Sequence, residues 1–166
     1  MTGWSARGLS WTGVGFNECY DRALLPALDP AVEISHVMFV GADGYQCVLL
    51  LEDAMRDDVL LADQLDGDAL GVATGGPVRL VSPQQYGYKS AKHLTEIQLC
   101  TAEPPLRPPD WYRRIAARLV SPHVRARVIL EERHRHVPAW IVRYLYRPMI
   151  APGAHIARRR ARRGVY

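Results

Sequence analysis

The sequence predicts an α+β fold in residues 1–103, made of mixed small sheets with brief helices, and a short helical basic extension after it. Short β-rich runs alternate with turn residues through the first hundred positions, without the regular strand–helix repeat of a parallel sheet. The hydrophobic period then changes beyond a proline-rich segment. With 166 residues, 48% of them hydrophobic, the chain is long enough to bury one core.

The strands of the first domain are predicted where aliphatic and β-branched residues gather between turn residues. Residues 41–44 separate the first two runs, and Asp66-Gly67 is a tight-turn pair that ends the third. The first helix should stop near Pro26 and Pro30, because proline breaks a helix. The predicted strands span residues 34–40, 45–51, 59–65, 78–81 and 94–100, and the short helices span residues 17–25 and 51–56.

Residues 104–109 form a predicted stiff linker, because four of these six residues are proline. Beyond it, residues 110–166 form the basic extension. Asp110 can cap a helix whose apolar face carries Trp111, Ile115 and Leu119. Two more helices are predicted at residues 124–132 and 139–147, and residues 158–163 form an arginine-rich tail that we expect to be mobile.

Charge divides the chain in the same place. Residues 1–100 contain 6 Lys/Arg and 13 Asp/Glu, whereas residues 101–166 contain 15 Lys/Arg and 4 Asp/Glu. The net charge of +4 therefore combines an acidic domain with a strongly basic extension. The two parts face different surroundings, or they face each other.

The three cysteines, Cys19, Cys47 and Cys100, are widely spaced and odd in number. This favours reduced, partly buried thiols over a disulfide framework or a zinc site. No signal peptide opens the chain as given, and no run approaches ~18 apolar residues. The chain as given is therefore predicted to be cytoplasmic.

The most informative segment spans residues 74–92. It holds three of the six basic residues of the acidic portion, Arg79, Lys89 and Lys92, together with glycines and the hydroxyl of Ser90. Concentrated cations, accessible backbone amides and small residues are what an anionic phosphate ligand needs. A hairpin with two solvated lysines explains the same residues equally well on physical grounds, and the spacing fits neither a Walker loop nor a dinucleotide fingerprint.

Five motifs in order resemble the signature of molybdopterin-dependent oxidoreductases of the sulfite-oxidase superfamily. They cover residues 3–97 and leave residues 101–166 outside the match. The motifs are GWS…WTGV at residues 3–14, DGY at 43–45, DVLLA…DGDAL at 58–70, GGPVRLVSP at 75–83 and YGYKSAK at 86–92.

The resemblance implies the sulfite-oxidase molybdopterin-binding fold and a molybdenum–molybdopterin cofactor. Arg79, Ser90 and Lys92 match positions that bind its phosphate and pterin, and the backbone from Lys89 through Ala91 to Lys92 is expected to follow the ligand. The resemblance also implies a cofactor contact at Thr74, where the family often has His or Asn. The implied reaction transfers an oxygen atom to or from a small oxyanion or sulfoxide. The electron-transfer partner is unknown, because no haem or flavin motif is present.

The resemblance also places the family's molybdenum-ligating cysteine directly before Met1, at the edge of this sequence. No catalytic residue is identifiable as a result, and we expect little turnover from the chain as given. A GUG codon encodes valine internally and methionine at a start. We therefore expect the natural protein to begin upstream, with a segment that carries this cysteine and an export signal to the cell envelope. A non-catalytic remnant that acts as a binding module is the alternative.

Three interpretations remain open for the basic extension. Aromatic and aliphatic residues between positions 137 and 152 favour docking on the acidic domain. Peripheral membrane contact through an amphipathic helix is the second interpretation. Nucleic-acid binding is the third, but no recognition motif accompanies the arginines, so no specific nucleic-acid partner is predicted.

Overall fold

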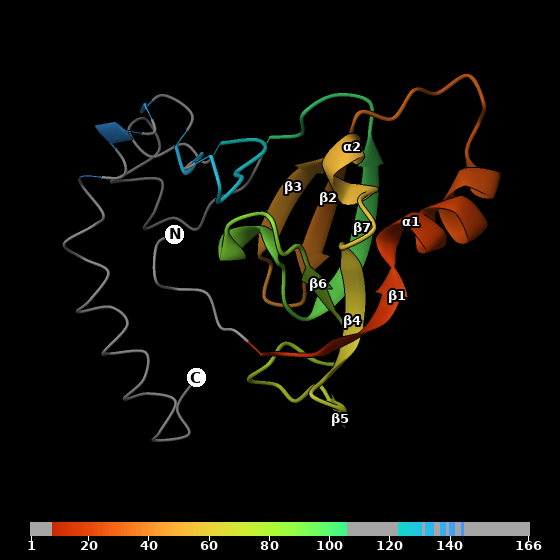
Figure 1. Ribbon diagram of the computed structural model, residues 1–166. Coiled ribbons are helices and arrows are strands. Elements are labelled where there is room, and N and C mark those ends of the chain that lie inside the picture. Colours follow the sequence, from red (N-terminus) through yellow and green to blue (C-terminus); the bar gives the residue numbers. More distant parts are fainter. Residues whose placement is uncertain are drawn as a thin grey trace.

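The computed structural model describes residues 8–105, 123–130, 132–134, 137–138, 140–141 and 144. Within them, two small antiparallel sheets form the body of the domain (Figure 1). In the first sheet, β4 (Leu60–Leu65) is central and pairs with β1 (Trp11–Gly15), β5 (Asp68–Ala69) and β6 (Arg79–Val81). In the second sheet, β2 (His36–Gly41) lies between β3 (Gln46–Leu50) and β7 (Leu94–Cys100). The predicted α+β class is confirmed.

The helices are short and lie at the ends of strands. A continuous helical segment follows β1, consisting of α1 (Phe16–Cys19), the π-helical turn η1 (Tyr20–Leu24) and the 3₁₀ turn η2 (Leu25–Ala27). It ends in a turn that contains Pro26, as the sequence predicts. The other two elements are α2 (Leu51–Ala54), directly after β3, and the 3₁₀ turn η3 (Gly87–Lys89). Among the described residues, no helix is long and apolar enough to cross a bilayer.

All five strands predicted from the sequence are present, with ends within two residues of the expected positions. The strand β1 was not predicted, because the two glycines in WTGVG dilute its β-propensity. It forms by pairing with β4, and a bulge interrupts that pairing between Thr12 and Gly13.

The helix predicted at residues 124–132 is wrong for the part of it that the structure describes. Residues 123–130 form bends, turns and an isolated β-bridge between Arg127 and Gln85. Ala126 has a φ of 48°, which a helix does not allow, and its buried backbone pairs with the domain instead. Tertiary hydrogen bonding has overridden the local apolar pattern here. Of the helix predicted at 139–147, Trp140, Ile141 and Tyr144 are helical, and its other residues lie outside the described part, as do residues 110–122 and the arginine tail.

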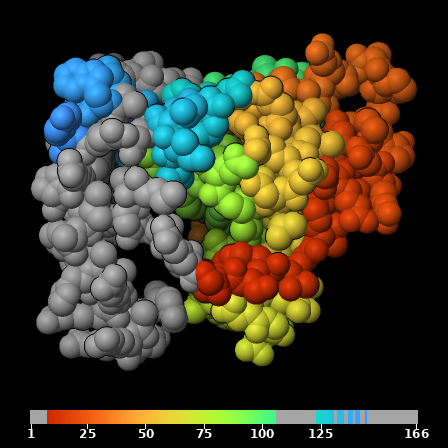
Figure 2. All heavy atoms as spheres, in the orientation of Figure 1, coloured from red at the N-terminus to blue at the C-terminus, as the bar shows by residue number. Residues whose placement is uncertain are grey.

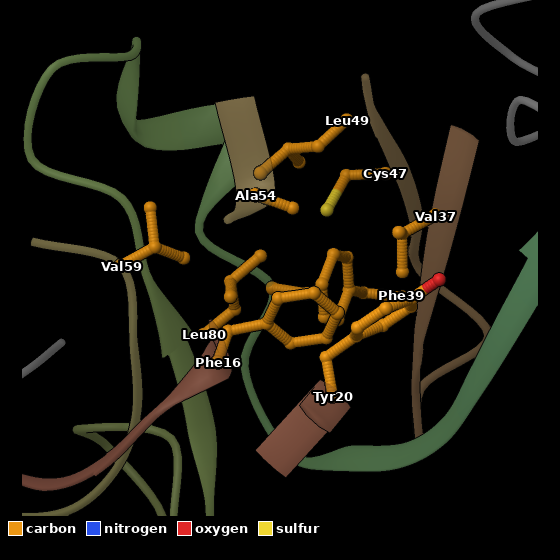
Figure 3. Close-up of a cluster of buried hydrophobic side chains, with 10 residues drawn as sticks. Phe16, Tyr20, Val37, Phe39, Cys47, Leu49, Ala54, Val59 and Leu80 are labelled. Carbon is orange, nitrogen blue, oxygen red and sulfur yellow. The ribbon is translucent and has the colours of Figure 1, made fainter. Parts of the chain in front are cut away.

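The hydrophobic core lies between the two sheets (Figure 3). Phe16 is fully buried at its centre and meets Phe39 edge to face, with ring centroids 5.3 Å apart. Its backbone amide donates to the Val59 carbonyl oxygen at 2.9 Å, which ties the start of the helical segment to the strand region before β4. Other core residues come from both sheets and from α2, among them Val37, Cys47, Leu49, Ala54 and Leu80.

We predict that Phe16→Ala lowers the free energy of unfolding by roughly 3–5 kcal/mol, because it removes a buried ring and leaves a cavity between the sheets. Urea denaturation measures this loss. Leu25→Ala, at a side chain that is 50% exposed on the same helical segment, should cost less than about 1 kcal/mol. Similar losses for the two variants would contradict this placement of the core.

Candidate functional site

The Arg79 guanidinium lies at the centre of the candidate site. It is half-buried at the start of β6, and desolvation by that burial lowers its pKa. Nη1 donates to the Thr74 carbonyl oxygen at 2.8 Å, and Nη2 approaches the Ser90 carbonyl oxygen at 3.5 Å. Its Nε is buried and has no hydrogen-bond partner within the described part of the chain. The group therefore keeps donor capacity for a ligand.

Trp11 covers one face of this guanidinium, with Cζ 4.9 Å from the ring centroid. The contact crosses β4, because β1 and β6 pair with opposite edges of that strand. Small residues occupy the intervening positions: Gly13 lies opposite Ala62, which in turn lies opposite Arg79. A Cβ on Gly13 would lie 2.1 Å from the Leu61 carbonyl oxygen, so a side chain cannot be accommodated there. Our site prediction missed Trp11, although it belongs to the first of the five motifs.

Lys92 brings a second cation to the same place. Its side chain is exposed, and Nζ donates to the Ala73 carbonyl oxygen at 2.7 Å. Partial desolvation, followed by the positive charge of Arg79, lowers the Lys92 pKa. Neither cation has a carboxylate partner among the described residues. Two neighbouring positive charges that no described carboxylate neutralises create a positive potential that favours an anion.

Gly75 lets the Lys92 side chain lie directly on the backbone. It has a φ of 101°, and a Cβ at this position would lie 2.9 Å from Cγ of Lys92. The turn is closed by the Thr74 amide and hydroxyl, which both donate to the Gly71 carbonyl oxygen, at 3.1 and 3.0 Å. Thr74 thus presents its carbonyl to Arg79, while its hydroxyl serves the turn.

Ser90 and Ala91 connect this turn to the sheet. The Ser90 hydroxyl oxygen accepts from the Ser82 amide at 3.2 Å, and the buried Ala91 carbonyl oxygen accepts from the Leu80 amide at 2.8 Å. The structure therefore brings Thr74, Arg79, Ser90 and Lys92 together around one surface. That these residues bind the cofactor stays a prediction.

Lys89 lies apart from this cation pair. Its side chain is only 4% exposed, and Nζ donates to the Val48 carbonyl oxygen on β3. Its backbone carbonyl oxygen accepts from the Cys47 thiol at 3.1 Å, and its amide donates to the Tyr86 carbonyl oxygen at 2.7 Å. The lysine thus anchors the loop to the second sheet from inside, while Lys92 is the exposed cation.

The three cysteines are free thiols, as predicted. Cys47 is buried in the core, whereas Cys19 and Cys100 are half-buried. Burial raises the pKa of Cys47 from 9.0 to about 11, although the nearby Lys89 ammonium opposes this shift. Cys47 is therefore a protonated packing thiol at neutral pH. The described residues contain no group of three or more His, Cys, Asp or Glu side chains that could hold a metal ion.

The sequence was compared with protein-family models and with known proteins. The family model described as "Oxidoreductase molybdopterin binding domain" matches residues 2–107. Two similar proteins are the nitrate reductases [NADPH] of Beauveria bassiana, 32% identical over 137 residues, and of Fusarium oxysporum, 33% identical over 133 residues. These matches cover 74% and 72% of this chain but only 14% of each relative. The chain thus spans a small part of the length of these relatives.

We predict that the free energy of unfolding falls as the pH rises from 9 towards 11, and that Cys47→Ala makes this fall shallower. A thiol with a higher pKa in the folded state holds its proton more tightly there. Its contribution is complete below pH 9 and is lost as the pH passes about 11. A two-unit shift corresponds to about 2–3 kcal/mol.

Denaturation of both proteins across this pH range measures the difference. Cys100→Ala, at a half-buried thiol, is the matched control and should change the slope less. The same slope in Cys47→Ala and the parent protein would show that Cys47 does not carry this pH dependence.

Proposed function

This chain belongs to the oxidoreductase molybdopterin-binding domain family, whose cofactor is molybdenum–molybdopterin, and we propose that Arg79, Ser90 and Lys92 hold the phosphate and pterin of that cofactor. The observation that carries this proposal is the cation pair Arg79 and Lys92, which no carboxylate neutralises among the described residues. Both residues lie within the matched segment, residues 2–107.

The residues present fit such a group chemically. The buried Nε of Arg79 lacks a hydrogen-bond partner among the described residues, and a phosphate oxygen would provide one. The Lys92 ammonium supplies further donors, and the Gly75 backbone leaves room for close approach. Trp11 and the carbonyls of Thr74 and Ser90 hold the guanidinium in one plane, so it does not need to be ordered when the ligand binds.

We further propose that the reaction is oxygen-atom transfer of the sulfite-oxidase type, and that the two small sheets correspond to that fold. When bound, the cofactor supplies the two-electron redox chemistry, and the protein positions it. The substrate is a small oxyanion or sulfoxide. The relatives favour an oxyanion, because they are named nitrate reductases and nitrate is one. The role of this chain is to bind the anionic end of the cofactor, while an electron-transfer partner completes the cycle.

We predict that Arg79→Ala and Lys92→Ala each reduce molybdopterin affinity. Loss of the Arg79 contact should cost about 1.5–3 kcal/mol of binding free energy, a roughly ten- to hundredfold weaker Kd, because a charge-assisted hydrogen bond to phosphate is removed. Lys92→Ala should weaken binding less, because its ammonium is exposed to solvent.

Pterin content per protein, measured by fluorescence after oxidative release, tests both variants. Arg79→Lys keeps the charge but loses the planar fork, so it should retain an intermediate amount. Arg22→Ala, which removes an exposed arginine on η1, should match the parent protein. Parental pterin content in both Arg79→Ala and Lys92→Ala would overturn the assignment of the anion site.

A further inference from the structure

The basic extension is attached to the loop that leads into the candidate site. The Tyr86 amide donates to the Ala126 carbonyl oxygen at 2.9 Å, and the Val128 amide donates to the Gln84 carbonyl oxygen at 2.9 Å. These bonds flank the bridge between Gln85 and Arg127. Figure 2 shows this part of the extension, in cyan, lying against the green surface of the domain.

The buried side chain of Gln85 stabilises the contact between the extension and the loop. Its side chain is 6% exposed, and its Nε2 donates to the Arg125 carbonyl oxygen at 2.6 Å. Its Oε1 accepts from the Ser82 hydroxyl at 2.9 Å. The amide therefore joins the extension to the residues that follow β6, and Ala126 is fully buried beside it.

Three stacked planar side chains, those of Arg133, Tyr86 and Tyr88, also join the extension to the loop. The Arg133 guanidinium lies over the Tyr86 ring, with Cζ 4.6 Å from the centroid. The Tyr86 and Tyr88 rings are nearly parallel, at 6°, with centroids 5.9 Å apart. The Tyr88 hydroxyl donates to the Arg133 carbonyl oxygen at 3.3 Å, which returns the stack to the extension.

Two ion pairs stabilise the described part of the extension and its contact with the domain. Arg127 forms a bidentate ion pair with Glu132, with N–O distances of 2.9 Å. The pair connects the residues that contact Gln84 and Gln85 with Arg133, which contacts Tyr86. Arg125 forms an ion pair with Glu52 of α2. The positive charge of the extension thus meets specific carboxylates on its own turn and on the acidic domain.

The gripped loop passes directly into the site. The Lys89 amide donates to the Tyr86 carbonyl oxygen at 2.7 Å, and the Ser90 amide donates to the Gly87 carbonyl oxygen at 3.1 Å. The Ser82 residue that holds Gln85 also donates its amide to the Ser90 hydroxyl oxygen. A displacement of Tyr86 or Gln85 therefore reaches Ser90 through one or two hydrogen bonds.

We propose that the described residues 123–130 and 132–134 form a clamp that holds residues 84–92 in their ligand-facing conformation, with Arg133 as a positioning residue that acts through Tyr86. The identity of the ligand rests on the proposed function. On that function, the clamp would order residues 84–92 before molybdopterin binds. An ordered loop loses less conformational entropy on binding, so the clamp should slow cofactor loss.

Amide hydrogen exchange on the 166-residue protein without cofactor tests the clamp directly. In Arg133→Ala we expect exchange at Tyr86, Lys89 and Ser90 to become about tenfold faster, in line with the loss of a cation–π contact and of the order it imposes. Arg133→Lys keeps a cation over Tyr86 and should restore much of the protection. Arg22→Ala removes an exposed arginine on η1, which none of the contacts between the extension and residues 84–90 includes, so it should leave exchange in this loop unchanged.

Unchanged exchange at these amides in folded Arg133→Ala would overturn the clamp. If Arg133→Ala does not fold, Tyr86→Leu, which removes the ring under the guanidinium, decides the question by the same measurement, and parental exchange at Lys89 and Ser90 in that variant would overturn the clamp. The second readout is the dissociation rate of molybdopterin, which we expect to rise roughly tenfold in Arg133→Ala. A faster-exchanging loop with a parental dissociation rate would disprove the link to the cofactor. A parent protein that binds no molybdopterin would contradict the proposed function, while exchange would still decide whether the clamp exists.

Discussion

Half-burying Arg79 without a carboxylate partner is the constraint around which the described site is organised. A desolvated guanidinium is costly, and its lowered pKa reflects that cost. Backbone carbonyls from the turn at Thr74 and the loop at Ser90, with the ring of Trp11, offset part of it. Three segments far apart in sequence must therefore converge on one side chain. Arrangements that keep an uncompensated cation in place are typical of sites that receive an anion.

Small residues make this convergence geometrically feasible. Gly13 and Ala62 have no large side chains that would separate Trp11 from Arg79 across β4. Gly75 lets the Lys92 side chain lie across its backbone. A larger side chain at Gly13 or Ala62 would separate Arg79 from the Trp11 ring, and a side chain at Gly75 would displace the Lys92 side chain. Gly13 weakens β1 as a strand but keeps this contact open, and pairing with β4 compensates for the weaker propensity.

The sequence predicted the α+β class and five strands, because alternating apolar runs between turn residues are local signals. It grouped Arg79, Ser90 and Lys92, which do lie together. Local pattern could not assign Lys89 to the core and Lys92 to the surface, since both are lysines three positions apart around a 3₁₀ turn. Their separation depends on β3, whose Val48 carbonyl receives the Lys89 ammonium. Trp11 was missed for the same reason: its contact with Arg79 spans sixty-eight positions.

The extension shows how charge asymmetry becomes structure. Residues 101–166 carry 15 Lys/Arg against 4 Asp/Glu, and this excess alone fits a membrane, a nucleic acid or the acidic domain. In the described part, Arg125 and Arg127 are engaged by Glu52 and Glu132, and backbone bonds to residues 84–86 fix the register. Electrostatic complementarity brings such surfaces together without specifying a register, whereas hydrogen bonds define it. The helix predicted at residues 124–132 fails in its described part for the same reason: the backbone groups of Ala126 and Val128 that bond to residues 84–86 cannot also bond within a helix.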